Sequence, residues 1–109
     1  MSYTNKLIAN VFSLTETIKY GQNSIVSQQI LKNPSGNITL FAFDKDQQLS
    51  EHTAPFNALV QILEGSAEIH ISGTPYHLKS GNVIILPANI PHAVYANMRF
   101  KMLLTLLKG

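Results

Sequence analysis

The chain has 109 residues, of which 45% are apolar and 13% charged, and its eight Lys and Arg against six Asp and Glu give a net charge of +2. This balance predicts one globular domain and excludes a disordered chain. Basic residues are scattered singly from Lys6 to Lys108, which excludes a nucleic-acid-binding stripe, and the lack of cysteine excludes disulfides and thiolate metal sites.

The N-terminal segment, residues 1–23, is expected to form an arm or short helix outside the main body of the domain. Leu7, Ile8, Val11 and Leu14 are spaced as on one face of a helix, so a short helix and an irregular packed arm both remain open. No charged segment followed by a continuous apolar run begins the chain, and no apolar stretch is long enough to span a bilayer. A cytoplasmic protein without a membrane partner is therefore expected.

From Ser24 onwards the pattern is typical of short strands separated by compact turns. β-branched and aromatic runs alternate with Gly, Pro, Asn and Asp clusters, and Glu64-Gly65-Ser66 is interpreted as a turn between two strands. This spacing predicts nine or ten short strands and an all-β antiparallel barrel or sandwich, such as a double-sheet jelly roll. The expected strands are 25–31, 38–43, 49–52, 58–63, 67–71, 76–79, 83–86, 93–96 and 100–107.

The last segment, FKMLLTLLK, is apolar on both faces when drawn as a strand. A strand with one face in water would alternate apolar and polar residues. We therefore expect it to lie between the core and either a partner subunit or the N-terminal arm. The low charged fraction also favours a covered surface, and a homodimer is the simplest expectation.

The segment GNVIILPANIPHAVYA carries a spaced motif. Gly81 is followed by Pro87 after five residues and then by His92, while Asn89 and Ala96 occupy two further positions of the motif. This spacing resembles the second cupin motif, G-x5-P-x-G-x2-H-x3-N. Asn89 stands where that motif has Gly, a mild change because Asn tolerates the left-handed backbone conformation.

The segment DQQLSEHTAPFNALVQILEG resembles the first cupin motif, G-x5-H-x-H-x(3,4)-E-x6-G. Gly65 and His52 match it, whereas Ala54 and Ala58 replace its second His and its Glu. The whole layout is similar to small single-domain bacterial cupins, also described as RmlC-like. The resemblance implies a double-stranded β-helix over the single domain 1–109, with a motif-bearing core over about 38–107.

The resemblance makes His52 and His92 candidate ligands of a divalent metal such as iron, manganese, nickel or zinc. Only two of the four cupin ligand positions are kept, so a weak site is expected unless a third ligand is supplied. Asn57, Gln61 and Glu51 are the candidates for it, but strand alternation places each on the face opposite the motif positions, unless a bulge near Pro55 changes that alternation. Without a metal, the two imidazoles would hydrogen-bond a ligand, a water or each other.

A small organic ligand is expected between the two sheets, because cupin barrels bind small molecules there. His52, His92, Val60, Ile62 and Tyr95 are the candidate ligand-binding residues, and further apolar lining is expected from Phe41 or Phe43 and from Ile85. His70 and His77 are expected on the surface. A few polar groups in an apolar cavity are the usual form of such a site.

Three functions remain open because the cupin fold supports many activities. A metal-assisted enzyme would use His52 and His92. A non-catalytic ligand-binding or sensing module would explain the missing ligands at Ala54 and Ala58. A structural dimeric barrel would explain the doubly apolar last strand. No catalytic triad, phosphate loop or paired carboxylates can be identified, so whether the chain is an enzyme stays open.

Overall fold

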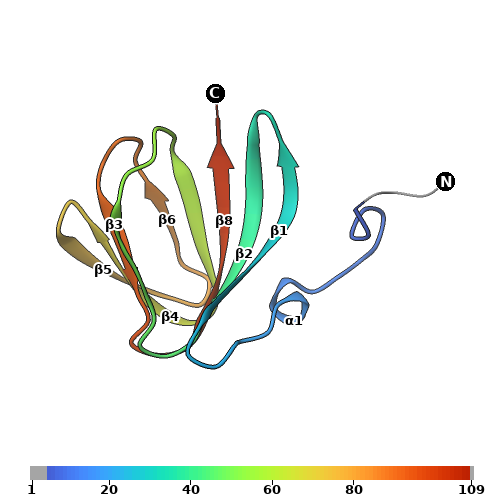
Figure 1. The fold of residues 1–109 in the computed structure, drawn as a ribbon, viewed down its shortest axis with the longest axis horizontal. Helices are drawn as coiled ribbons and strands as arrows, with labels where there is room; N and C mark the ends of the chain where they lie inside the picture. Colours follow the sequence, from blue (N-terminus) through green and yellow to red (C-terminus); the bar gives the residue numbers. More distant parts are fainter. Residues whose placement is uncertain (1–4, 109) are drawn as a thin grey trace.

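The computed structural model describes residues 5–108 and contains, over that range, eight antiparallel strands and a one-turn helix (Figure 1). The helix α1 spans Leu14–Thr17. The strands are β1 (Ile25–Asn33), β2 (Gly36–Phe43), β3 (Gln48–His52), β4 (Ala58–Ile71), β5 (Thr74–Lys79), β6 (Val83–Leu86), β7 (His92–Tyr95) and β8 (Phe100–Leu107).

The strands form two sheets that share β4. In the first sheet the order is β1-β2-β8-β4-β6, and in the second it is β3-β7-β4-β5. The first half of β4 pairs with β8 and β6, and its second half pairs with β5 and β7. Figure 1 shows the two sheets joined at the lower end by β4 and diverging towards the opposite end. The predicted antiparallel double-sheet barrel is confirmed.

The predicted turn at Glu64-Gly65-Ser66 is wrong, because this segment lies inside the single strand β4. Gly65 has a φ of 76° and pairs with Phe100, so the strand bends there and passes from one sheet into the other. A bend that keeps its ladder partners differs from a turn, although both use glycine in the left-handed region. Two expected strands are therefore one, and residues 5–108 contain eight strands instead of nine or ten.

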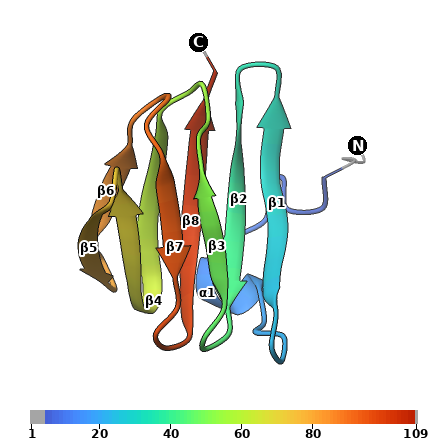
Figure 2. The same cartoon turned by 60° about the vertical axis from the view of Figure 1, so that its left-hand side comes forward.

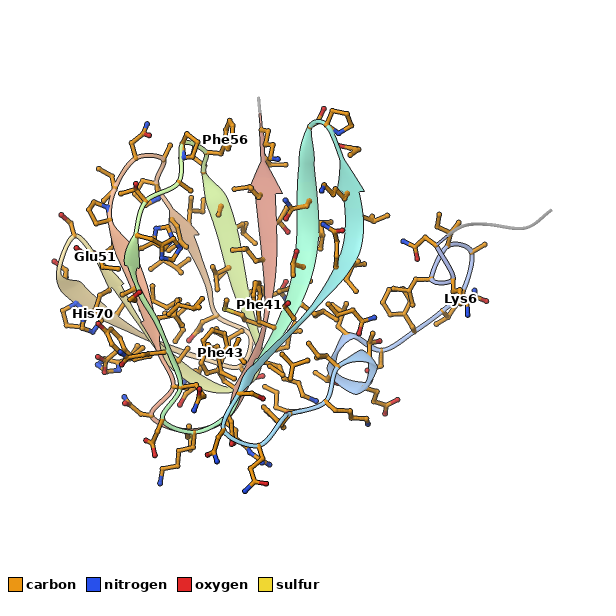
Figure 3. All side chains as sticks on the ribbon, in the orientation of Figure 1. Lys6, Phe41, Phe43, Glu51, Phe56 and His70 are labelled. Atoms are coloured by element: carbon orange, nitrogen blue, oxygen red, sulfur yellow. The ribbon has the colours of Figure 1, made fainter. Side chains whose placement is uncertain are left out.

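Strand alternation divides each sheet into an inner and an outer face. The inner side chains form the main core, in which Phe43 and Phe100 are fully buried and their rings stack with centroids 4.5 Å apart. The rest of this core consists of apolar side chains from β4 to β8, mainly Ala58, Val60, Ile62, Ala67, Ile69, Leu78, Leu86, Val94, Ala96 and Met102. Figure 3 shows Phe41 and Phe43 projecting into the space between the sheets.

The N-terminal arm packs on the outer face of the first sheet, behind the strands in Figure 2. Ile18 is 2% exposed and forms a second core with Ile30, Leu40 and Ala42. Leu103 of β8 packs against this core, so the arm, which was one of the two expected covers of the last strand, lies over its outer face there.

Of the two alternatives left open for the arm, a helix with one apolar face from Leu7 to Leu14 does not form. The only helix in the described part of the arm is the four-residue α1, which begins after the N-cap Ser13. Leu7 and Leu14 pack on the second core, whereas Val11 is fully exposed. The irregular packed arm is the alternative that the structure supports. Among residues 5–108, no helix has the length and apolar character needed to cross a membrane.

Candidate functional site

His52 and His92 come together on the inner face of the second sheet. They end β3 and begin β7, and the two residues are direct cross-strand partners. Their Nε2 atoms lie 3.1 Å apart, and the rings meet edge to face with centroids 4.3 Å apart. Two histidines separated by forty positions in the chain therefore form one pair, which we call the histidine pair.

A β-bulge in β3 makes this meeting possible. Leu49 is opposite Val94, but His52 is opposite His92, so β3 has one more residue than β7 between the two pairs. In a regular strand, Leu49 and His52 would lie on opposite faces because they are three residues apart. The extra residue reverses that alternation, and His52 joins Leu49 on the inner side. Bulges often re-aim side chains next to functional sites in this way.

Backbone carbonyls orient both rings. His52 Nδ1 lies 2.8 Å from the carbonyl oxygen of Ser50, inside the bulge, and His92 Nδ1 lies 3.4 Å from that of Ile90. A carbonyl only accepts, so Nδ1 of His52 carries a proton, and in the neutral form of this ring Nε2 is the acceptor. The longer contact of His92 holds its tautomer weakly. With its proton on Nε2, His92 can donate to His52. With its proton on Nδ1, the Nε2 atom of His92 instead presents a lone pair to a donor or a cation.

Burial distinguishes the two histidines. His92 is 7% exposed, and His52 is exposed. Burial lowers the pKa of His92, and the neighbouring His52, which would repel a second positive charge, lowers it further. The neutral imidazole is therefore the favoured form of His92 at neutral pH, and the pair acts as a hydrogen-bonding or coordinating group.

The side chains around the pair are mostly apolar. Val60 and Ile62 lie on the inner side as predicted, but both are completely buried, so neither presents accessible surface. Their role in ligand binding stays a prediction. Half-buried inner residues retain accessible surface while they pack on the core. One of them, Phe41, was expected. The others were not predicted from the sequence: Leu49, Ile71, Ile84, Leu104 and Leu106. For Leu104 and Leu106, the alternation of side chains along β8 was the signal available in the sequence.

The expected inward placement of Tyr95 and Ile85 is wrong. Tyr95 follows the buried Val94 on β7 and lies on the outer face, where its ring packs on His70 with centroids 4.7 Å apart. Ile85 pairs with Leu59 on the outer face of the first sheet and is 59% exposed. Tyr95 cannot contact a ligand held at the histidine pair from that side of the sheet.

His70 and His77 lie on the outer face, as expected. His70 Nε2 bonds Glu68 Oε2 at 2.6 Å, and His77 Nδ1 is 3.8 Å from Glu68 Oε1. Asn97 Nδ2 donates to the same carboxylate at 3.2 Å, and these groups hold the pKa of Glu68 below its usual value, with the His70 bond as the largest cause. Figure 3 shows His70 on the outer side of its sheet.

The described part of the chain places no third metal ligand beside the histidine pair. Asn57 Oδ1 accepts from the backbone N–H of Ala88, Gln61 alternates with the buried Val60 and Ile62, and Glu51 is exposed. Within residues 5–108, no group of three His, Cys, Asp or Glu side chains is placed to hold a metal ion. The two imidazoles alone do not fit a metal centre built by the chain, since such ions normally take three or more protein ligands.

Two surface cavities lie elsewhere in the described structure. One, of about 250 Å³, lies at the β1–β2 hairpin beside the end of β8, between Lys32, Ile38 and Leu107. The other, of about 200 Å³, lies under the arm between Leu7, Phe12 and Leu31. Neither is lined by His52 or His92.

The double-sheet barrel with two motif histidines on its inner face defines a cupin-type domain. The chain belongs to the family of AraC-like ligand binding domains, whose family model matches residues 35–101. The cupin resemblance seen in the sequence motifs is thereby confirmed.

Several solved structures share the fold over nearly the whole chain. A conserved protein of unknown function from Streptococcus pyogenes is 39% identical with a TM-score of 0.91, covering 100% of this chain and 96% of its own. A cupin superfamily protein from Desulfitobacterium hafniense is 27% identical with a TM-score of 0.90, and the match covers 100% of both chains.

A longer relative contains the same domain. The cupin 2 conserved barrel domain protein from Leptotrichia buccalis is 41% identical with a TM-score of 0.86, over 89% of this chain and 47% of that one. The chain therefore spans about half the length of this relative. No curated protein matches the sequence.

Proposed function

We propose that the chain is a binding module for a small organic molecule, which lies between the diverging sheets against the histidine pair. The observation that carries the proposal is the 3.1 Å approach of the two Nε2 atoms on the inner face, beside apolar side chains with accessible surface. Membership of the AraC-like ligand binding domains supports a binding role.

The tautomers suggest the chemistry of the ligand. His52 offers a lone pair at Nε2, and His92 can match it or donate. An acceptor at His52 Nε2 suits a ligand that brings hydroxyl or N–H donors, whereas a carboxylate would find only one weakly held donor, at His92. Phe41, Leu104 and Leu106 would pack on its apolar part. A small hydroxylated or amine-bearing molecule with an apolar face is the expected class.

A divalent metal is the second candidate, favoured by the spacing of the pair. Two nitrogens about 2.0–2.1 Å from a tetrahedral zinc lie roughly 3.3 Å apart, close to the observed separation. Two ligands leave the remaining positions to be filled, so iron, manganese, nickel or zinc would be held jointly by the pair and by donors of the ligand. The metal is thus proposed as an accessory to ligand binding.

The test is a thermal-shift screen of untagged protein against small hydroxylated and amine-bearing compounds, each with and without zinc, nickel, manganese or iron(II). A compound present at a hundred times its Kd should stabilise the fold by about 2.7 kcal/mol. For a domain of this size that is a rise in Tm of roughly 10 °C or more. The shift should vanish in His52→Ala and His92→Ala.

His70→Ala is the matched control, because it removes a histidine from the outer face of the same sheet. It should keep the full shift. If His52→Ala and His92→Ala respond to a bound compound as the unaltered protein does, the ligand does not lie at the histidine pair. Dependence of the shift on an added metal would support the second candidate, and a shift without metal would support the first.

We also propose that the chain acts as a homodimer. The support is the number of large apolar side chains that stay exposed on the described chain, among them Val11, Ile85 and Leu107, together with the low charged fraction. Exposed apolar surface on this scale is typical of protein interfaces.

A further inference from the structure

An apolar strip lies uncovered on the outer face of the first sheet. Leu59 and Ile85 are cross-strand partners on β4 and β6, and Val83 lies two residues from Ile85 on the same face. Their exposed fractions are 36%, 59% and 51%, and Leu107 at the end of β8 is 68% exposed. We call these four residues the outer strip. It continues the face whose other half, around Leu103, the N-terminal arm covers.

The N-terminal arm has its own uncovered apolar side. Val11 is fully exposed, and Ile8 and Phe12 are 40% and 38% exposed. Asn5 Nδ2 donates to the carbonyl of Ile30 at 2.8 Å, which fixes the start of the arm at β1. Figures 1 and 2 both show the arm on the β1 side of the sheet, with β6 towards the other side. The arm of a chain therefore does not cover the outer strip of the same chain.

We propose that the exposed side of the arm, residues 8–12, packs on the outer strip of a second copy of this chain, and that the second copy returns the same contact. A single chain carries both apolar surfaces, so the exchange needs no other partner. Reciprocal contacts about a twofold axis close after two copies and leave neither surface free. The proposal rests on the homodimer proposed above and is independent of the ligand site.

The area available is sufficient for a stable dimer. The exposed fractions of Ile8, Val11, Phe12 and the outer strip correspond to on the order of 700 Å² per copy, against about 800 Å² per partner in a standard interface. No charged side chain belongs to either set, which matches the depletion of charge at the centre of interfaces. Val11 supplies the anchor, since burying a fully exposed side chain yields the largest gain.

The first test measures the oligomeric state by sedimentation equilibrium on the full chain. The unaltered protein is expected to be dimeric at micromolar concentration, and Ile85→Lys and Val11→Asp should each weaken the dimer at least a hundredfold. Met98→Lys is the control, because Met98 is 50% exposed outside both surfaces and should leave the dimer unchanged. A monomeric unaltered protein refutes both the dimer and this interface. A dimer that tolerates Ile85→Lys and Val11→Asp refutes the interface alone.

The second test uses the absence of cysteine from the sequence. Val11→Cys and Ile85→Cys are prepared separately, mixed and oxidised, so that any disulfide between the two different positions must join two chains. A covalent heterodimer in the mixture, stronger than the product of either variant alone, supports arm exchange. Products joining only like with like, or none, overturn it, and Phe12→Cys with Val83→Cys provides a second geometry for the same contact.

Discussion

Replacing Gly65 by Ala tests whether the bend in β4 holds the two sheets together. Gly65 has a φ of 76°, where an L side chain costs about 1–2 kcal/mol. An added Cβ would also overlap the backbone carbonyl of Arg99 and lie 3.0 Å from Cα of Phe100. Overpacking of this kind typically costs about 1–3 kcal/mol, because the strand pair must move apart. The expected total is about 3 kcal/mol, or a Tm lowered by roughly 15 °C.

Two other glycines separate the strain from the overlap. Gly73 and Gly81 have φ values of 81° and 90°, but a Cβ at either would meet nothing within 4 Å. Gly73→Ala and Gly81→Ala should therefore lose only about 1–2 kcal/mol. Thermal unfolding is followed by circular dichroism at one fixed protein concentration, since Tm of a dimer depends on concentration. Equal losses of stability in all three variants would contradict the argument that the close approach of β8 leaves no room for a side chain at position 65.

Two further predictions concern the contacts that fix the loops and the arm. Asp44 accepts from Arg99 Nε at 2.7 Å, and mainly this bond holds its pKa below the ordinary 3.8, so its contribution is complete above pH 3.8 and is lost as the pH falls through the lower folded value. Asp44→Asn should lower the free energy of unfolding at pH 7. When this free energy is measured by urea unfolding at a series of pH values, it should also fall less steeply at acid pH in the variant. An equally steep fall in both proteins would exclude this role. Lys101 is 7% exposed and donates to the carbonyl of Thr15 at 2.6 Å, so Lys101→Met should cost about 2 kcal/mol and speed hydrogen exchange over residues 14–20. Unchanged exchange there would show that the arm is held by its apolar contacts alone.

The strands could be predicted because their period and turn residues are local signals. The end of β2 at Phe43 and the turn at Ser72 and Gly73 follow from residue types within a few positions. The bend at Gly65 could not be distinguished from a turn by the same means. Both need a glycine with positive φ, and only the pairing with β8 decides whether the strand continues.

The outward placement of Tyr95 was available from the sequence. His92 and Tyr95 are three residues apart on one strand, so they must lie on opposite faces unless a bulge intervenes. No register shift interrupts the pairing of β4 with β7, from His92 opposite Ile71 to Tyr95 opposite Glu68. Assigning His92 to the inner face therefore already implied that Tyr95 points outward. An aromatic residue type favours an inward Tyr95, but alternation along the whole strand excludes that placement.

The same alternation fails at His52, and there the failure creates the site. Leu49 and His52 are also three residues apart, yet both lie on the inner face because β3 contains a bulge between them. No glycine marks the bulge in Ser50-Glu51, so residue types gave no sign of it. The family motif placed His52 correctly because a motif preserves spacing together with any irregularity it contains. The bulge also supplies the Ser50 carbonyl that fixes the tautomer of His52, so one inserted residue both aims the ring and sets which nitrogen faces His92. The direction of the His52 ring and the proton on its Nδ1 thus follow from the same local departure from regular strand geometry.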